Sequence, residues 1–231
     1  MSEQFERIFR DRRDAGLALA DKLAAYANRA DVLVLALPRG GVPVAAEVAR
    51  AIHAPLDIFL VRKLGVPGHE ELAMGAIATG GVRVLNQDVI RLAGITPEVI
   101  EAVTRNELEE LARRERVYRG TRGTRSVRDR LIILIDDGLA TGSTMRAAIT
   151  ALRQHKPAGI VVAVPVSAAD TCDDLKAEVD RIVCAVTPEP FFGVGMWYED
   201  FTQTTDQEVR DLLDQVARQQ HETMDGRGAQ S

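Results

Sequence analysis

LIILIDDGLATGSTMRAAITAL, residues 131–152, joins an apolar run to a helical pattern through two adjacent acids and a loop of small residues. The run Leu131–Ile135 is typical of a strand that is covered on both faces of a sheet. The apolar residues after the loop recur at helical spacing. Asp136 and Asp137 are therefore expected at the carboxyl end of a strand, which is the edge of an open α/β sheet where ligands bind.

The two acids and the loop have a common chemical explanation. Adjacent carboxylates repel each other unless a bound group shares them. A ribose diol can donate hydrogen bonds to both, and Mg²⁺ can screen the remaining charge. In the loop Ala140–Thr144, backbone N–H groups at a helix N-terminus and three hydroxyls favour a phosphate site. A left-handed turn capped by Ser143 or Thr144 would explain the loop, but it leaves the acid pair unexplained.

Two familiar phosphate loops do not fit this sequence. A P-loop needs lysine before its Ser/Thr, and Gly142-Ser143-Thr144 has none. A dinucleotide fingerprint has its glycines directly after the first strand, and the residues that follow Leu37 do not match it.

The rest of the chain alternates short apolar runs with amphipathic patterns, which predicts right-handed βαβ units and a doubly wound, mostly parallel α/β sheet. A β-hairpin is expected around Gly80-Gly81. The residues 65–75 are expected to form a polar loop. The expected strands are 32–37, 56–64, 131–135, 159–166 and 181–186, and the main expected helices are 14–29, 96–118, 143–152, 168–178 and 205–219.

Composition limits the class of protein. The chain has 231 residues, 46% of them hydrophobic, and a net charge of −5, which argues against a general nucleic-acid binder. It has neither an apolar run long enough to span a bilayer nor a signal-peptide core, so we expect a cytoplasmic protein. Cys172 and Cys184 are expected to be buried apolar residues. The segment Arg113–Arg130 carries eight arginines; it is either a solvated surface, an anion-binding rim or an RNA patch.

The opening stretch resembles the phosphoribosylpyrophosphate (PRPP) signature of the type I phosphoribosyltransferases, in which a strand, two acids and a Thr-Gly-x-Thr loop follow one another. Pro38-Arg39-Gly40-Gly41 is similar to the pyrophosphate loop of that family. Arg62-Lys63 resembles the basic pair of the adenine enzymes. The stretch from Gly65 to about Gly81 corresponds to the mobile lid, and Thr187–Phe201 to the hood that recognises the acceptor base.

The resemblance implies a role for each matching residue. Asp136 and Asp137 would bind the ribose hydroxyls, with weaker support for a direct or indirect contact to Mg²⁺. The 5′-phosphate would bind to Ala140, Thr141, Gly142, Ser143 and Thr144. The pyrophosphate would be held by Arg39, Gly40, Gly41, Arg62 and Lys63, with Arg39, Lys63 and Asp137 as the catalytic residues.

The acceptor of the phosphoribosyl group is not specified by these motifs. The 6-oxopurine enzymes have an acid immediately before Thr-Gly, where this chain has Ala140, so adenine or orotate enzymes are the better comparison. Trp197, and less strongly Phe192, are candidates for stacking on a flat base. Two alternatives stay open: a PRPP- or nucleotide-sensing regulator of the same fold that binds RNA through its arginines, and a phosphohydrolase that uses the same phosphate site.

The resemblance also implies the organisation of the chain. We expect one domain over residues 1–220, with the lid, hairpin and a helical insertion at about 65–120 and the hood at about 187–201. Residues 221–231 are expected to be a disordered tail. The implied partners are PRPP, Mg²⁺, a nucleobase-like molecule and a second copy of the chain, without a membrane or nucleic acid.

Overall fold

A five-stranded parallel sheet forms the centre of the protein, for which we describe a computed structural model over residues 9–228. The strands lie in the order β2-β1-β6-β7-β8, and every neighbouring pair is parallel. Their bounds are β1 Val32–Ala36, β2 Leu56–Ile58, β6 Leu131–Ile135, β7 Gly159–Val166 and β8 Arg181–Val186. All residues of β1 and β7 are buried, as their uninterrupted apolar runs predict.

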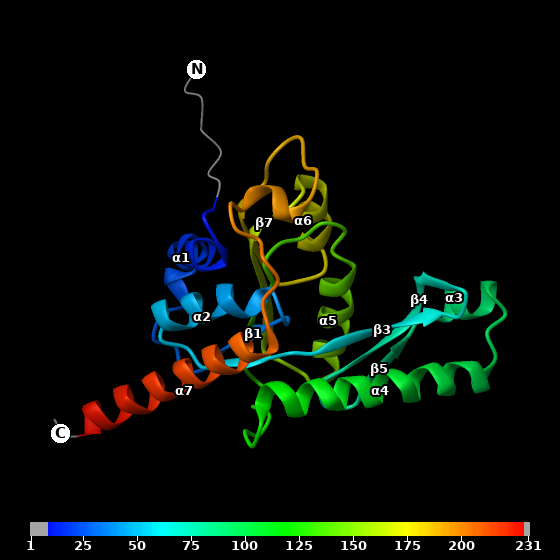
Figure 1. Ribbon diagram of the computed structural model, residues 1–231, viewed down its shortest axis with the longest axis horizontal. Helices are drawn as coiled ribbons and strands as arrows, with labels where there is room; N and C mark the ends of the chain where they lie inside the picture. The colour runs from blue at the N-terminus through cyan, green and yellow to red at the C-terminus, as the bar shows by residue number, and fades with distance from the viewer. Residues whose placement is uncertain (1–8, 229–231) are drawn as a thin grey trace.

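Helices cover both faces of this sheet (Figure 1). Side chains on one face pack with α1 (Arg12–Lys22), α2 (Gly41–Ala51) and the first part of α7 (Asp206–Gly228). Side chains on the other face pack with α5 (Ser143–Gln154), and α6 (Ala169–Lys176) follows on that side. The alternation of strands and helices thus forms the doubly wound α/β fold that the sequence predicts.

An arm extends from one side of the sheet (Figure 1). It contains a three-stranded antiparallel sheet of β3 (Val61–Val66), β4 (His69–Ala78) and β5 (Val82–Leu85). The short helix α3 (Gln87–Leu92) and the long helix α4 (Pro97–Arg119) return the chain toward the body. The predicted hairpin around Gly80-Gly81 is the β4–β5 turn, where both glycines have positive φ.

The arm corrects two predictions made from the sequence. The expected strand 56–64 is two strands in different sheets, because the chain leaves the parallel sheet at Phe59 and Leu60. Phe59 N donates to Ala36 O, and Leu60 N donates to Thr79 Oγ1. The expected polar loop 65–75 is part of β3 and β4, since Val66 and Met74 are buried against the main core.

The ends of other elements also differ from prediction. The sequence-based helix 14–29 is α1 followed by a short 3₁₀ turn, η1 (Ala24–Tyr26). Helix α3 is not among the predicted elements, although Asn86 caps it through hydrogen bonds from two backbone amides. Helix α7 continues to Gly228, past its expected end near Gln219 and into the expected tail, because no proline or glycine stops it before Gly226. The tail residues 229–231 lie outside the described part of the chain.

The two cysteines are joined, which corrects the prediction of separate buried apolar residues. A disulfide links Cys172 on α6 to Cys184 on β8, with 6.8 Å between their Cα atoms. The two residues are 12 positions apart, and the packing of α6 beside β8 brings them together.

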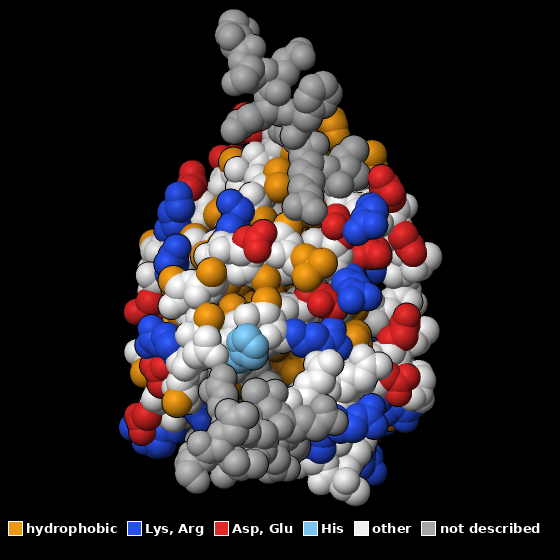
Figure 2. Space-filling model, turned by 90° about the vertical axis from the view of Figure 1, so that its left-hand side faces the viewer, with side chains coloured by type: hydrophobic (Ala, Val, Ile, Leu, Met, Phe, Trp, Pro, Cys, Tyr) orange, Lys and Arg blue, Asp and Glu red, His pale blue; other side chains and the backbone are white. Residues whose placement is uncertain are grey.

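Surface charge on the side formed by α1, α2 and α7 is mixed. Figure 2 shows basic and acidic side chains interspersed with small apolar areas over this face, outside the grey residues. The described side chains on this face therefore form no extended basic area of the kind that binds nucleic-acid backbones. Within residues 9–228, no helix has both the length and the apolar character needed to cross a membrane.

Candidate active site

The loops after β1 and β6 meet at the carboxyl edge of the parallel sheet. The chain proceeds from β1 to β2 in one direction and from β6 to β7 and β8 in the other, so the strand order reverses between β1 and β6. Leu37 N donates to Ile135 O at 2.9 Å, which aligns the ends of the two strands. Ligands of doubly wound folds bind at such a reversal.

Close packing between these loops requires two glycines. A Cβ at Gly40 would lie 1.9 Å from Asp137 Oδ2, and a Cβ at Gly41 would lie 2.7 Å from Ile135 O. The peptide bond between Pro38 and Arg39 is cis. The structure therefore brings the predicted pyrophosphate loop directly against the predicted ribose-binding acid.

Asp136 and Asp137 are adjacent acids that directly follow the last residue of β6. Asp137 N donates to Asp136 Oδ1 at 2.9 Å. Burial raises the pKa of Asp136 well above the usual value for aspartate, and the negative charge of Asp137 raises it further. Hydroxyl donors from a ligand would favour the charged form of Asp136.

Arg12 places a positive charge beside this acid pair. No sequence pattern indicates this role for Arg12. Its Nε donates to Asp137 Oδ2 at 2.8 Å, and its Nη1 donates to the Thr202 carbonyl at 2.7 Å. Its guanidinium carbon lies 4.0 Å from the centroid of the Phe201 ring. Arg12 thus connects helix α1, the acid pair and the segment that follows the predicted hood.

The predicted phosphate loop leads into α5 through a left-handed residue. Gly142 has φ 69°, a left-handed conformation that favours glycine, and it stands at the N-cap of α5 without a side-chain cap. Arg146 Nη1 donates to the Thr141 carbonyl at 2.9 Å, and Thr171 Oγ1 donates to the Ala140 carbonyl at 2.8 Å. These bonds fix the loop. The amide of Ser143 makes only a long contact, 3.5 Å to Thr141 Oγ1, which an anion at the start of α5 could replace.

The predicted basic residues lie at different distances from the acid pair. The guanidinium of Arg39 extends toward Asp206 at the start of α7, with 3.5 Å between Nη1 and Oδ1. Asp206 also accepts a 2.9 Å hydrogen bond from the hydroxyl of Tyr118. The Arg39 backbone therefore belongs to the loop, while its side chain is paired at the mouth of the site.

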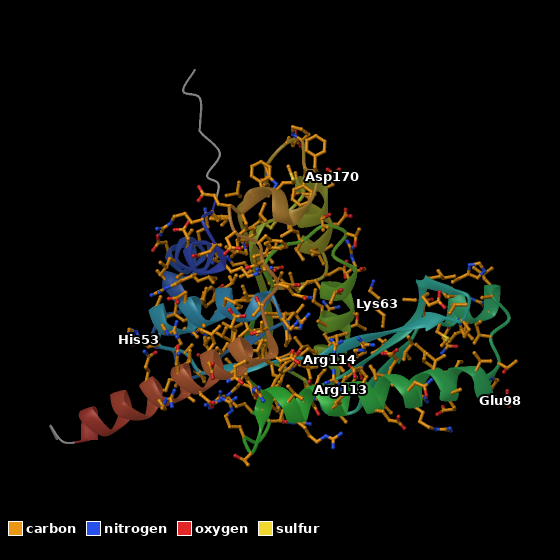
Figure 3. The ribbon with its side chains drawn as sticks, in the orientation of Figure 1. His53, Lys63, Glu98, Arg113, Arg114 and Asp170 are labelled. Carbon is orange, nitrogen blue, oxygen red and sulfur yellow. A yellow bond between two sulfur atoms is a disulfide. The ribbon has the colours of Figure 1, made fainter. Side chains whose placement is uncertain are left out.

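Arg62 and Lys63 point to opposite faces of β3, as strand alternation predicts. Arg62 Nε donates to Glu107 Oε2 on α4 at 2.6 Å. Lys63 is exposed, makes no ion pair with a described residue, and lies beside α5 on the side of the arm away from α4 (Figure 3). Lys63 is therefore the free cation of the predicted basic pair.

Arg114 is the residue of the arginine-rich segment that lies near the predicted site. It lies at the end of α4 where this helix meets α7 and β3 (Figure 3), and it lines the same small cavity as Pro38, Arg62 and Thr144. The pKa of its partner Glu110 is lowered to about 2 by hydrogen bonds from Arg113 and Arg114. The sequence shows an arginine-rich segment here, but its pattern does not indicate which arginine faces the loops.

The predicted hood folds over the acid loop. The hydroxyl of Tyr198 donates to the Asp137 carbonyl at 2.6 Å, and a Cβ at Gly138 would lie 2.4 Å from a methyl carbon of Val194. Trp197 is half-buried, and its indole nitrogen is buried without a hydrogen-bond partner among the described residues. Phe192 is 80% exposed, so it contacts the site less closely than Tyr198 does.

The donor set at the sheet edge fits Mg²⁺ bound together with a phosphorylated substrate. Among the side chains that the structure describes, which exclude Glu71 and those after Gln220, no three His, Cys, Asp or Glu gather into a metal site. Asp136 and Asp137 supply two carboxylates, and Mg²⁺ commonly takes its remaining ligands from substrate phosphates and water. The residues present therefore fit a metal that arrives with the substrate.

Comparison with known proteins identifies the family of the chain. The profile of the family described as phosphoribosyl transferase domain matches residues 11–200. The chain belongs to this family. Its similarity thus covers the parallel sheet, both loops, the arm and the hood.

Three groups of relatives illustrate the similarity. Two provisionally named phosphoribosyl transferases from strains of Mycobacterium tuberculosis are 47% identical over 92% of this chain and 48% of their own, so the chain spans about half the length of these relatives. The bifunctional protein PyrR of Deinococcus radiodurans is 32% identical over 55% of this chain and 71% of its own. The crystal structure of TT1426 from Thermus thermophilus is 40% identical, with a TM-score of 0.80 over 89% of this chain and 97% of that one.

Proposed function

We propose that the chain transfers the 5-phosphoribosyl group of PRPP to a ring nitrogen of a nucleobase-like acceptor and releases pyrophosphate, with Mg²⁺ bound to the substrate. The observation that carries this proposal is the contact between the Pro38–Gly41 loop and the carboxylate of Asp137 at the strand-order reversal. A ribose held by the acids would place its C1 beside a loop suited to the leaving group.

Each group of the substrate has a matching set of residues. The amides and hydroxyls of Ala140, Thr141, Gly142, Ser143 and Thr144 would bind the 5′-phosphate. Asp136 and Asp137 would accept hydrogen bonds from the two ribose hydroxyls. The backbone of Arg39, Gly40 and Gly41 would face the pyrophosphate. The side chains of Arg39, Arg62 and Lys63 are the candidates to bind its charge.

The reaction would form a bond from the acceptor nitrogen to C1 and break the bond from C1 to pyrophosphate. Negative charge grows on the leaving group, so cations placed there stabilise the transition state more than the ground state. Mg²⁺, when bound with the substrate, would neutralise part of that charge. Arg39 would exchange Asp206 for the pyrophosphate, and Lys63 would approach from the arm.

The acceptor would lie between the acid loop and the hood. Trp197, with Phe192 as the weaker candidate, would stack on its ring. We further propose a homodimer, since exposed leucines lie on the arm and Leu92 is 87% exposed. Light scattering at micromolar concentration would refute the dimer if it gave a mass near 25.2 kDa, that of one chain.

The direct test of transfer is to incubate the protein with PRPP, Mg²⁺ and a panel of nucleobases, and to measure both pyrophosphate and the nucleotide formed. Arg39→Ala should lower turnover on the order of a hundredfold, because it removes a charge that acts on the leaving group. It should retain binding of a nucleoside monophosphate, which has no pyrophosphate. Arg29→Ala is the matched control: Arg29 also pairs with an aspartate, Asp31, but stands just before β1.

The outcomes separate an enzyme from a sensor. Nucleotide formation that depends on Arg39 supports transfer. If no base yields a nucleotide while PRPP still binds, the site is that of a regulator. Pyrophosphate release without nucleotide formation would instead indicate hydrolysis.

A further inference from the structure

A second cavity of about 360 Å³ lies away from the proposed PRPP site. It is enclosed by the end of β2, the β4–β5 turn, the end of α5 and the linker before β6. Its volume falls within the range of small-molecule sites. The residues that matter for its chemistry are Phe59, Thr79, Thr124, Arg125, Arg128 and His155.

The length of α5 separates this cavity from the phosphate loop. The loop precedes Ser143, the first residue of the helix, whereas His155 is its C-cap. The helix has 12 residues, and at 1.5 Å per residue it spans about 18 Å. No lining residue of the cavity belongs to the acid pair, the phosphate loop or the pyrophosphate loop. A ligand here would therefore occupy a separate site.

Two unpaired arginines give the cavity a positive rim. The guanidinium groups of Arg125 and Arg128 are exposed and make no ion pair or hydrogen bond with any described residue. Other arginines of the same segment are paired: Arg119 with Asp57 and Arg122 with Asp214. Arg125 and Arg128 thus bring unpaired positive charge to this cavity, where a guanidinium can bind a phosphate through two parallel hydrogen bonds.

The linker that carries these arginines is held in place. Arg119 is 7% exposed in its side chain, and its Nη1 donates to Asp57 Oδ2 at 2.6 Å. The positive charge of Arg119 thereby neutralises Asp57, which is the acid that lines the cavity. Asp57 Oδ2 also accepts from the backbone amide of Arg125 at 3.1 Å, and Asp129 N donates to Lys156 O at 3.1 Å. A linker fixed at both ends loses little further entropy when it binds a ligand.

The inner wall of the cavity is largely apolar and aromatic. Phe59 is 1% exposed and meets His155 edge to face, with ring centroids 6.2 Å apart. Leu35 and Ile58 complete this wall. Thr79 and Thr124 add hydroxyl groups between the apolar wall and the basic rim. Because Phe59, Ile58 and Leu35 are at most 2% exposed, the half-buried ring of His155 is the flat surface that a ligand meets at this end, and the other end is suited to an anion.

We propose that this cavity binds a phosphate monoester that carries a flat ring, of the class of the nucleoside monophosphates. The phosphate contacts Arg125 and Arg128, and the ring lies toward Phe59 and His155. Such a ligand also touches the root of the arm, because His155 Nε2 lies 3.1 Å from the Thr79 carbonyl in the β4–β5 turn. The site thus connects a bound nucleotide to the arm that carries Lys63.

Adenosine 5′-monophosphate is a suitable probe, titrated by calorimetry into a variant whose phosphate loop is blocked. Ser143→Glu places a negative charge at the start of α5 and should exclude phosphate from that loop. This variant should still bind one nucleotide per chain. Adding Arg125→Glu or Arg128→Glu should weaken that binding tenfold or more, because each substitution removes a charge-assisted hydrogen bond to the phosphate. Adding Arg105→Glu, the same charge change on an exposed α4 residue without an ion pair, should leave it unchanged.

Smaller ligands test the two ends of the cavity. Ribose 5-phosphate, which lacks the ring, should bind more weakly than the nucleotide, and equal affinity would overturn the aromatic part of the proposal. Absence of nucleotide binding to the Ser143→Glu variant at millimolar concentration overturns the site, as does binding that neither arginine substitution changes. If a charge reversal prevents folding, Arg128→Gln gives the same test, because it removes the charge without reversing it. None of these results depends on phosphoribosyl transfer, which the nucleobase panel tests separately.

Discussion

Arg12 and Asp137 form an ion pair in which Nε lies 2.8 Å from Oδ2 and both side chains are largely buried, with exposed fractions of 11% and 16%. The pair joins the first helix to the acid at the end of β6. Because Arg12 also bonds the Thr202 carbonyl and covers the Phe201 ring, one guanidinium joins Asp137 to the segment at residues 201–202. The acid pair therefore depends on a residue that lies outside every recognised motif.

Replacing Arg12 tests whether its ion pair with Asp137 stabilises the fold more than an exposed arginine does. Arg12→Gln leaves Asp137 with an unpaired charge and should lower the free energy of unfolding by about 2 kcal/mol, measured by urea denaturation. Arg12→Lys should recover part of this loss. Arg13→Gln is the matched control, because Arg13 is 74% exposed and its partner Glu47 keeps a second ion pair with Arg50; it should change stability by about 0.5 kcal/mol or less. Equal losses for Arg12→Gln and Arg13→Gln would contradict the proposed role.

Because the two loops are in close contact, an alanine at Gly40 should weaken PRPP binding, whereas an alanine at the distant Gly123 should not. Gly40→Ala would force its Cβ against Asp137 Oδ2 and displace either the acid or the loop. PRPP affinity should fall tenfold or more, because the displaced Asp137 carboxylate would lose its hydrogen bond to the ribose. Gly123→Ala, whose Cβ would meet no atom within 4 Å, should bind PRPP like the wild type. A Gly40→Ala protein with normal affinity would show that the loops do not act together.

The raised pKa of Asp136 predicts a dependence of stability on pH. An unfolded aspartate titrates near pH 4, and the folded group titrates at higher pH. Between these values the folded state holds the proton more tightly, so the free energy of unfolding falls as pH rises through this window and stays lower at neutral pH. Asp136→Asn should therefore raise the melting temperature at pH 7 by a few degrees, and the gain should shrink below pH 4. Thermal scans across pH would contradict this if the gain were the same at every pH.

The two basic residues of β3 should contribute differently. Lys63→Ala should lower turnover on the order of a hundredfold. Lys63 has no ion-pair partner among the described residues and lies beside α5, from where it would approach the pyrophosphate. Arg62→Ala removes the pair with Glu107 on α4 and should mainly loosen the arm, at a cost below about 1 kcal/mol. Glu107→Gln is the control for the loss of that pair. Steady-state rates and unfolding curves of the three variants would contradict this assignment if Arg62→Ala reduced turnover more than Lys63→Ala.

The sequence predicts those parts of the site that are local in the chain. Asp136, Asp137 and the loop to Thr144 follow directly from an apolar strand and a helix start, so their positions depend only on neighbouring residues. The Pro38–Gly41 loop is equally local, and parallel pairing of β1 with β6 places it beside the acids. The fold class follows from the same alternation of strands and helices.

The parts that sequence patterns do not predict depend on contacts between distant segments. Arg12 and Asp137 are 125 residues apart, and no spacing rule connects them. The Arg39–Asp206 pair requires α7 to begin beside the pyrophosphate loop. The break between β2 and β3 depends on a hydrogen bond from Leu60 to Thr79, a residue of the following turn. Each of these features arises only when the arm, the first helix and the last helix pack on the sheet.

Binding of PRPP with Mg²⁺ to the wild type and to Asp137→Asn, followed by calorimetry, tests the central claim most directly. Arg12→Gln should be titrated beside them, because it breaks the same ion pair without changing the acid. The proposed site predicts one PRPP per wild-type chain, a loss of affinity of tenfold or more in Asp137→Asn, and a smaller loss in Arg12→Gln. Equal PRPP affinity in the wild type and in Asp137→Asn would contradict the proposed site.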